Sequence, residues 1–171
     1  MLVPSAYMQS MAAFVAQNVG AKRLDRAGKA LLYGILSSLV VGLVMAYLSF
    51  FHGSALSTLF VKENDTAVIM AASDYLRAYS IDCILTSFLF CFIGYFNGRG
   101  KTLFVMIQGI VGAFGVRIPV SYLMTLTDGA SLFHIGLATP ASSVVQILLC
   151  AGYFLLLKRR QKKFLLENSA E

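Results

Sequence analysis

Hydrophobic residues fill five long stretches of the chain, and short polar segments separate them. About 20 consecutive apolar residues are enough to carry an α-helix across a hydrocarbon core of about 30 Å. The stretches cover residues 1–19, 30–51, 66–97, 102–126 and 131–157. Short turns at 98–101 and 127–130 join the last three, so we expect these to be antiparallel neighbours. The predicted fold class is all-α: a multi-pass transmembrane helical bundle of about five spans, followed by a basic cytoplasmic tail at 158–171.

Positive charge is concentrated in alternate gaps between these stretches. Twelve of the fourteen basic residues lie at span ends or between spans, and eleven of those fall in the first gap, the third gap and the C-terminal tail. They are Lys22, Arg23, Arg26, Lys29, Arg99, Lys101, Lys158, Arg159, Arg160, Lys162 and Lys163. Because Lys and Arg accumulate on the cytoplasmic side of membrane proteins, the pattern predicts a protein of the plasma (cell inner) membrane with its C-terminus cytoplasmic and its N-terminus outside.

Composition supports the membrane assignment and limits the expected partners. Hydrophobic residues make up 58% of the 171 residues and charged residues 13%, which is more apolar surface than one small soluble core can bury. The lipid bilayer is therefore an expected partner. A formal net charge of +6 would favour nucleic acid as a partner in a soluble protein, but here the charge sits in short loops beside apolar spans. We expect no nucleic-acid binding.

The first stretch differs from the others. It is marginal in length and contains Pro4, Gln9 and Ser10, and basic residues follow it instead of preceding it. A signal peptide carries its positive charge ahead of the apolar run, so an uncut first helix with its N-terminus outside fits better. Because the sequence starts abruptly in a half-length span, we expect it to be a piece of a longer protein.

Small residues mark places where helices can approach closely. Gly94 and Gly98 form a GxxxG pattern in the third span, and Gly109, Gly112 and Gly115 repeat along the fourth. Such residues usually let the backbones of neighbouring membrane helices pack together. We predict close helix packing at all five positions.

Two prolines lie within the last two spans. Pro119 and Pro140 each remove a helical hydrogen bond and free a carbonyl one turn back, at Gly115 and Gly136. The resulting kinks are either features of shape alone, or hinges and carbonyl ligands in a transport path.

Two ionisable side chains stand out because they lie deep within spans. Burying a charge at the membrane centre costs at least about 2.5 kcal/mol, which makes Asp82 and Arg117 functional candidates. Both are expected in the outer half of the membrane at similar heights, where they can form a permanent structural pair. Alternatively, Asp82 binds and releases a proton or a small cation while Arg117 tunes the pKa of its carboxyl group, or the Asp82 side chain reaches the outer surface of the membrane. Tyr75, Tyr79 and Thr86 repeat at helical spacing with Asp82 and form a polar stripe typical of an interior cavity.

Other polar groups point to packing instead of chemistry. Gln108 and Gln146 are uncharged mid-span residues, for which hydrogen bonds between helices are the usual role. The sequence has no phosphate-binding loop, no zinc-ligand spacing and no supported Ser-His-Asp arrangement. Neither an enzyme nor a cofactor is expected.

Five short motifs follow one another along the chain in a specific order. Gln17, Asn18, Gly20 and Ala21 form a Q-N-x-G-A pattern at the end of the first span. The other four motifs lie at residues 75–80, 94–102, 116–122 and 136–140. Their order and spacing resemble those of the second half of the multidrug and toxic compound extrusion family, and the resemblance covers nearly all of the chain.

This resemblance implies twelve helices in two six-helix halves and export of small organic cations in exchange for protons or sodium ions. The chain would correspond to helices eight to twelve, with the missing N-terminal half as its partner. In some members a carboxylate on the tenth helix takes part in a cation site. That position aligns with Thr86, one turn past Asp82, so the resemblance does not carry the role directly to Asp82.

Two other functions remain as alternatives. A flippase for lipids or lipid-linked oligosaccharides has a similar architecture, but its cavity should carry several cationic groups for phosphates, and only Arg117 is present within the spans. A structural membrane subunit without transport activity is the second alternative.

Overall fold

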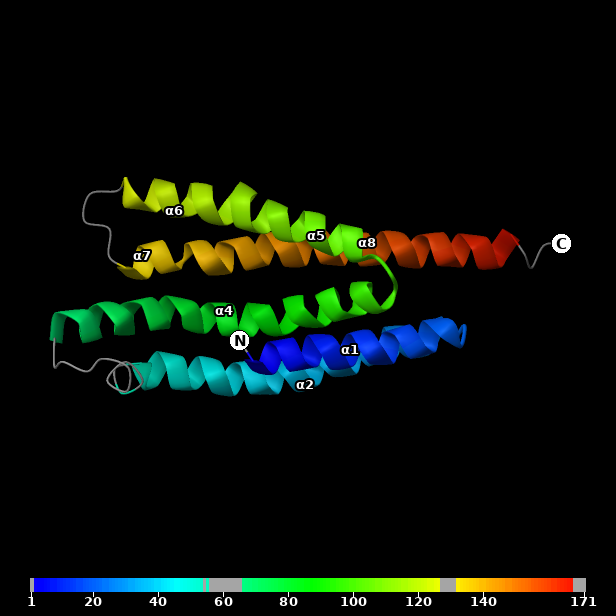
Figure 1. The fold of residues 1–171 in the computed structure, drawn as a ribbon, viewed down its shortest axis with the longest axis horizontal. Helices are drawn as coiled ribbons and strands as arrows, with labels where there is room; N and C mark the ends of the chain where they lie inside the picture. The colour runs from blue at the N-terminus through cyan, green and yellow to red at the C-terminus, as the bar shows by residue number, and fades with distance from the viewer. Residues whose placement is uncertain (1, 54, 56–65, 127–131, 168–171) are drawn as a thin grey trace.

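Helices form all of the secondary structure in the part of the chain that the computed structural model describes, which comprises residues 2–53, 55, 66–126 and 132–167. No β-strand occurs in these ranges. The elements are α1 (Leu2–Gly20), α2 (Leu24–Phe51), α4 (Thr66–Gly98), α5 (Thr102–Ile110), the π-helix η1 (Val111–Arg117), α6 (Ile118–Thr125), α7 (Leu132–Gly136) and α8 (Ala138–Glu167) (Figure 1). The chain is an all-α bundle, as predicted.

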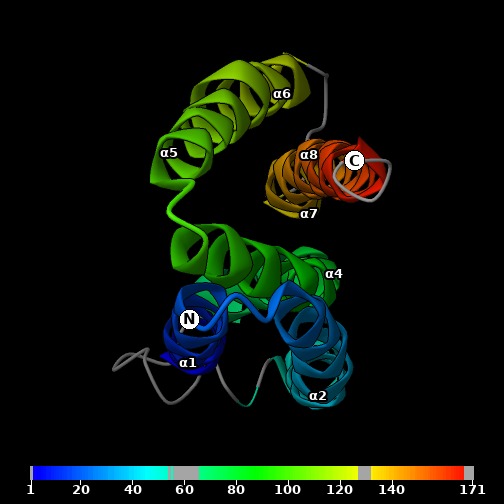
Figure 2. The ribbon, with the colours of Figure 1, turned by 90° about the vertical axis from the view of Figure 1, so that its right-hand side faces the viewer.

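Helix α4 lies at the centre of the bundle. Helices α1 and α2 pack on one side of it, whereas α7, α8 and the start of α5 pack on the other. Figure 2, which looks along the helices, shows α4 between these two groups. Successive long helices run in opposite directions, so α5–α6 is antiparallel to both α4 and α7–α8, as predicted, whereas α4 and α8, which also pack together, run in the same direction (Figure 1).

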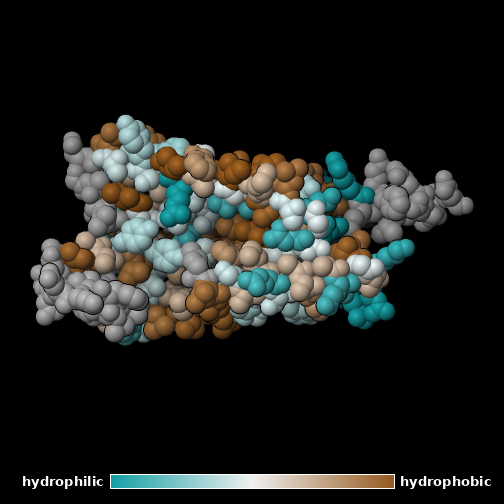
Figure 3. Space-filling view, viewed as in Figure 1, coloured by the Kyte–Doolittle hydropathy of each residue, from teal (hydrophilic) through white to brown (hydrophobic). Residues whose placement is uncertain are grey.

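Four segments among the described residues are long and apolar enough to cross a membrane: Leu24–Phe51, Val68–Gly98, Thr102–Thr125 and Phe133–Arg160. Helix α1 has 19 residues but is not one of them, because Gln9, Gln17 and Asn18 lower its hydropathy. Large hydrophobic side chains cover much of the outer surface (Figure 3). Phe114, for example, has 67% of its surface exposed and Leu148 has 66%. A surface of this kind is stable against lipid chains and not against water.

The basic segments gather at one end of the bundle. The α1–α2 turn, the α4–α5 turn and the last turns of α8 all lie at the end where the C-terminus is drawn (Figure 1). Hydrophilic residues are concentrated towards this end in the space-filling view (Figure 3). We call it the basic end. In an up-and-down bundle every second gap lies at the same end, so basic residues in alternate gaps must gather at one end.

The GxxxG pattern of α4 forms the seat for α1. A Cβ atom built on Gly94 would lie 2.5 Å from the carbonyl oxygen of Met8, and one on Gly98 would lie 2.6 Å from that of Ala12. Only glycine leaves room for these contacts between the two backbones. The predicted close packing is confirmed at both positions.

The glycines of the fourth span behave differently from one another. The side chain of Gln146 from α8 lies directly over Gly112, so close packing is confirmed there. The prediction was wrong for Gly109, which has open space around it, and for Gly115, whose nearest neighbour is Val111 of its own helix. The helix turns these two positions away from α8, so only one of three glycines meets a neighbour.

The fourth span contains a π-helical segment where a proline kink was predicted. In η1 the backbone N–H of Ile118 bonds to the carbonyl of Ala113, five residues back, so one extra residue is accommodated. Pro119 then falls at the start of α6, where its missing N–H is tolerated. The span remains continuous from Thr102 to Thr125.

The fifth span is broken near Pro140 and extends further than predicted. It divides at Leu137 into α7 and α8, which places Pro140 in the first turn of α8, where a backbone N–H is not needed. At the other end, α8 continues to Glu167, although we expected a tail from residue 158. No glycine or proline interrupts residues 153–167, and most of these residue types favour helices.

Candidate functional site

Asp82 lies in the interface between α4 and α8. Only 1% of its surface is exposed, which is exceptional for a carboxylate. The hydroxyl of Ser143 on α8 donates a hydrogen bond of 2.5 Å to Asp82 Oδ1. The other α8 residues near this level, Thr139 and Ser142, are also small, polar and buried. The carboxyl group is therefore held between two membrane helices and away from lipid.

Arg117 carries a positive charge that acts on this carboxyl group. It is the last residue of η1, and its electrostatic influence reaches Asp82. No ion pair within 4.0 Å joins the two residues; in the described part of the chain the one such pair is Arg77–Asp74, at 3.7 Å, and it is half-exposed. Arg117 itself is exposed. The permanent ion pair that was one of the predicted alternatives is therefore not formed in this structure.

The irregular segments of the last two spans border this site. Arg117 stands at the junction of η1 and α6, two residues before Pro119. Ser143 lies three residues after Pro140, in the second turn of α8. Arg117 therefore adjoins the end of the π-helix, whereas Ser143 lies within regular α-helix, in the second turn after the break at Leu137.

The predicted polar stripe of α4 divides between two surroundings. Tyr75 and Tyr79 stack with ring centroids 6.5 Å apart, and the Tyr75 ring lies against Gly136 of α7. The Thr86 hydroxyl donates to the backbone carbonyl of Asp82 at 2.8 Å, so it is not directed at the Asp82 carboxyl group. Tyr79 and Thr86 line a cavity on the opposite side of α4, whereas Asp82 turns towards α8.

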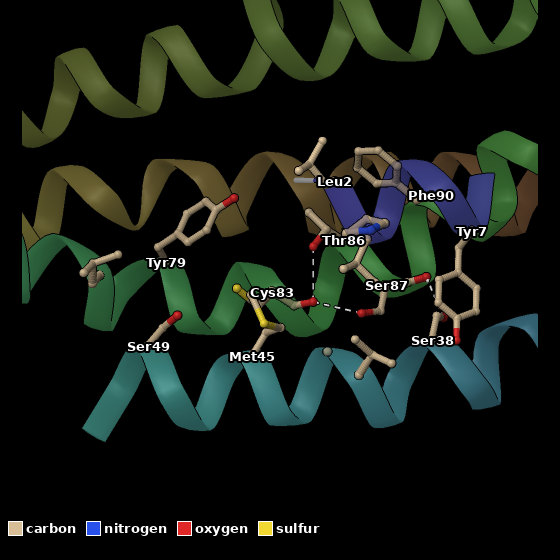
Figure 4. Close-up of a pocket in the computed structure, with 15 residues that line it drawn as sticks. Leu2, Tyr7, Ser38, Met45, Ser49, Tyr79, Cys83, Thr86, Ser87 and Phe90 are labelled. Atoms are coloured by element: carbon tan, nitrogen blue, oxygen red, sulfur yellow. Dashed lines mark hydrogen bonds between the residues drawn. The ribbon is translucent and has the colours of Figure 1, made fainter. Parts of the chain in front are cut away.

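This cavity has a volume of about 360 Å³ and lies between α4, α2 and the start of α1. Its walls are mostly aliphatic and aromatic, and none of its lining residues is charged. The polar groups that line it are Tyr7, Ser38, Ser49, Tyr79, Cys83, Thr86 and Ser87. Figure 4 shows these side chains converging from the three helices. Such a surface suits a compact, largely apolar organic molecule.

Two features, one at the Asp82 site and one in the fourth span, could not be predicted from residue spacing alone. Ser143 is one of several serines in the spans, and only the crossing of α4 and α8 identifies it as the partner of Asp82. Gln108 is 98% buried, with 2% of its surface exposed, and its Oε1 has no hydrogen-bond partner in the described structure. The predicted bond between helices is therefore not formed at that oxygen. A mid-span glutamine was the available signal.

The Q-N-x-G-A segment has a structural role at the basic end. The Asn18 side chain donates to the carbonyl of Phe14 at 2.8 Å, and the Ala21 N–H donates to the carbonyl of Gln17 at 3.0 Å. A bond of 2.8 Å from Arg23 N–H to the Asn18 carbonyl then closes the helix. The segment, including Gly20, ends α1 and turns the chain into α2. It lies well away from Asp82, which is about 22 Å from the α4–α5 turn at the same end.

The described residues contain no group of three or more His, Cys, Asp or Glu side chains placed to hold a metal ion. The chemistry available at Asp82 is that of one carboxyl group with a hydroxyl donor, influenced by a guanidinium that forms no ion pair with it. One carboxyl group can take up and release a proton, or contribute one ligand to a monovalent cation.

Two comparisons find known proteins that are similar to this chain. The family model MatE matches residues 1–123 of the chain. The probable multidrug resistance protein YoeA of Bacillus subtilis (strain 168) is 23% identical over 141 residues, which are 82% of this chain and 30% of that protein. The chain thus spans about 30% of the length of this relative. No solved structure matches this chain significantly. Since the family match covers well over half of the sequence, the chain belongs to the MatE family of multidrug and toxic compound extrusion transporters.

Proposed function

We propose that this chain forms part of a secondary active antiporter that exports organic cations and drugs in exchange for protons or sodium ions. Asp82 is the group that takes up the coupling ion. The observation that carries the proposal is the burial of this carboxyl group, 1% exposed, between two membrane helices. The family membership and the multidrug resistance relative support the transport function.

The energetics of burial favour an exchange role. A charged carboxylate between α4 and α8 is costly unless a proton, a cation or strong hydrogen bonds compensate it. The single bond from Ser143 compensates only in part. Occupied by an ion, the site stabilises this packing of α4 and α8; emptied, it favours a state in which water reaches Asp82. Such a difference in ion affinity between two states is what coupling requires.

The cavity on the other side of α4 supports the substrate class. Tyr7, Tyr79 and Phe90 supply aromatic surface, which attracts flat organic cations through their π-systems. A phosphate-bearing substrate, as in a lipid flippase, would call for cationic groups, and none lines this cavity. Since the chain spans only 30% of its relative, the complete path is proposed for a transporter in which an N-terminal half joins this chain.

The orientation completes the proposal: the basic end faces the cytoplasm of the cell, with the C-terminus inside. The test replaces Cys83, Cys91 and Cys150 with alanine and introduces one cysteine at Gly100 or at Leu126. An impermeant thiol reagent applied to intact cells should label the Leu126 position and not the Gly100 position. Labelling of Gly100 alone would reverse the orientation.

The coupling role is tested by Asp82→Asn in the complete transporter. This change keeps the shape and hydrogen-bonding capacity and removes the charge. Ion-gradient-driven efflux of a cationic dye from liposomes should fall about tenfold or more, which is about 1.4 kcal/mol, while dye binding at equilibrium changes much less. Asp74→Asn is the matched control, because the Asp74 side chain is about half-exposed and should leave efflux unchanged. Normal efflux by Asp82→Asn would refute the coupling role.

A further inference from the structure

A second cavity lies at the basic end, far along α4 from Asp82. Its volume is about 500 Å³, and it is lined by the first turns of α2, the last turns of α4 and the second half of α8. Helices α2 and α8 do not pack against each other in the described structure, so the cavity occupies the space between them next to α4. It is separate from the cavity near Tyr79, which has no lining residue in common with it.

Three basic side chains from three different helices converge on this cavity. They are Lys29 of α2, Arg99 of α4 and Lys158 of α8, against one carboxylate, Asp25. No carboxylate lies within 4.0 Å of any of the three cations in the described part of the chain. The cavity therefore carries excess positive charge that the protein does not itself neutralise, which favours an anionic ligand.

Arg99 is held in position for such a ligand. Its guanidinium donates a hydrogen bond of 2.8 Å to the Tyr95 hydroxyl and lies 5.5 Å from the centre of the Tyr95 ring. A guanidinium has five N–H donors, so most remain available after this bond. Because the planar group is already fixed, it can bind the oxygens of a phosphate with little further loss of conformational freedom.

The remaining walls of the cavity are apolar and border the lipid-facing surface. Leu32 lines the cavity and has 58% of its surface exposed, Leu24 has 38% exposed, and Phe154 completes the wall from α8. The cavity therefore combines cationic groups at the membrane boundary with hydrophobic surface leading along the spans. Basic pockets between membrane helices with this combination suit anionic lipid headgroups.

We propose that this cavity binds the phosphate of an anionic phospholipid, with Lys29, Arg99 and Lys158 around the headgroup and an acyl chain along Leu32 and Phe154. The lipid would link α2 and α8, which have no direct contact, through one shared ligand. This site is independent of ion coupling at Asp82.

The test compares lipids and one soluble phosphate. The chain is purified in a neutral detergent, freed of lipid, and titrated with phosphatidylglycerol, with phosphatidylcholine and with sn-glycerol 3-phosphate, and binding is followed by native mass spectrometry and by thermal stability. We expect phosphatidylglycerol to bind and to raise the unfolding temperature, and the other two to do neither at equal concentration. Equal binding of phosphatidylcholine, or of sn-glycerol 3-phosphate, would overturn the proposal of an anionic-lipid site.

Two triple variants separate the cavity from the general charge of this end. Lys29→Gln, Arg99→Gln and Lys158→Gln together should weaken phosphatidylglycerol binding about tenfold or more. Lys22→Gln, Arg23→Gln and Lys101→Gln remove the same charge from the same end outside the cavity, and should weaken it much less. Circular dichroism is used to check that both triple variants remain helical. Lys158→Gln alone changes an exposed side chain and should give an intermediate loss of phosphatidylglycerol binding. If both triple variants weaken phosphatidylglycerol binding equally, the binding is nonspecific attraction to the basic end, and the proposal of a specific site is overturned.

Discussion

The two sides of α4 hold their neighbours by opposite means. Towards α1, Gly94 and Gly98 bring two backbones into direct contact, and the atoms nearest to these glycines are backbone and apolar side-chain atoms of α1. Towards α8, a buried carboxyl group and a serine hydroxyl share the interface. The first interface depends on shape, and the second includes a hydrogen bond to a buried carboxyl group. One helix thus holds one neighbour by close packing of backbones and the other partly through a polar contact.

These two interfaces respond differently to change. Contact between backbones is lost as soon as any side chain is introduced, because neither backbone can yield locally. An interface built on Asp82 and Ser143 tolerates a change of shape better than a change of hydrogen bonding, since an unpaired buried charge is the largest cost. Two substitutions test this difference directly, and two smaller ones test packing and backbone conformation outside these interfaces.

The largest effect is expected for Gly94→Leu. Its Cβ would lie 2.5 Å from the Met8 carbonyl oxygen and 2.9 Å from Met11 Cβ, so α1 must move away from α4. We expect a loss of about 3 kcal/mol in the free energy of unfolding, measured by denaturant titration with circular dichroism. Gly109→Leu is the matched control because Gly109 has open space, and it should change stability little. Equal losses at both positions would contradict the role assigned to the glycine seat.

Ser143→Ala should have the next largest effect, about 2 kcal/mol, because it leaves the buried Asp82 carboxyl group without its donor. Ser142→Ala is the control, since within the described residues the Ser142 hydroxyl donates only to the Thr139 carbonyl of its own helix, at 2.8 Å. In the Asp82→Asn background the cost of Ser143→Ala should be smaller. Additive costs in this double-mutant cycle would show that the two side chains do not interact.

Gly112→Ala should cost about 1 kcal/mol, because the added methyl group meets the Gln146 side chain, which must then shift. Gly115→Ala adds the same group where only Val111 of the same helix is near, at 3.7 Å. It should be neutral or slightly stabilising, since alanine favours helix over glycine. Thermal unfolding of the pair distinguishes the two, and the opposite order would place α8 on the wrong face of the fourth span.

The smallest effect concerns a turn outside both interfaces. Lys22 has a φ of +57°, a left-handed conformation, and the bond from Arg23 N–H to the Asn18 carbonyl spans five residues. Gly100, with φ of +69°, occupies the same place in the α4–α5 turn, where Lys101 N–H bonds to the Phe96 carbonyl. Lys22→Gly should therefore stabilise the fold by up to about 1 kcal/mol in thermal unfolding. Destabilisation by this change would mean that the Lys22 side chain contributes more than its backbone costs.

The sequence predicted the features that depend on composition and local spacing. Long apolar runs give membrane helices, and Gly94 with Gly98 gives a close crossing, because both signals are contained in one segment. Asp82 was identified from its cost alone. The donor to Asp82 was not predicted, since choosing Ser143 requires knowing how α8 crosses α4.

Helix rotation was equally beyond local reasoning. Gly109, Gly112 and Gly115 look alike in the sequence, and only the orientation of the helix decides that Gly112 alone meets Gln146. A π-helix has no reliable local signature, because it depends on tertiary contacts that repay its poorer hydrogen bonding. Pro119 indicated an irregularity in the fourth span and left its form open.

The extra residue in η1 makes the fourth span a helix with two phases. An α-helix advances about 100° per residue, so residues after η1 face about 100° away from where an uninterrupted α-helix would direct them. The direction of Gln108, in α5, is set by the phase before the insertion, and the directions of the residues of α6 by the phase after it. Removing one residue from η1 would shorten the chain by a single peptide unit, yet it would turn the whole of α6 about its axis. Which residues in the outer half of this span face lipid therefore depends on the number of residues between Val111 and Arg117 as much as on the types of those residues.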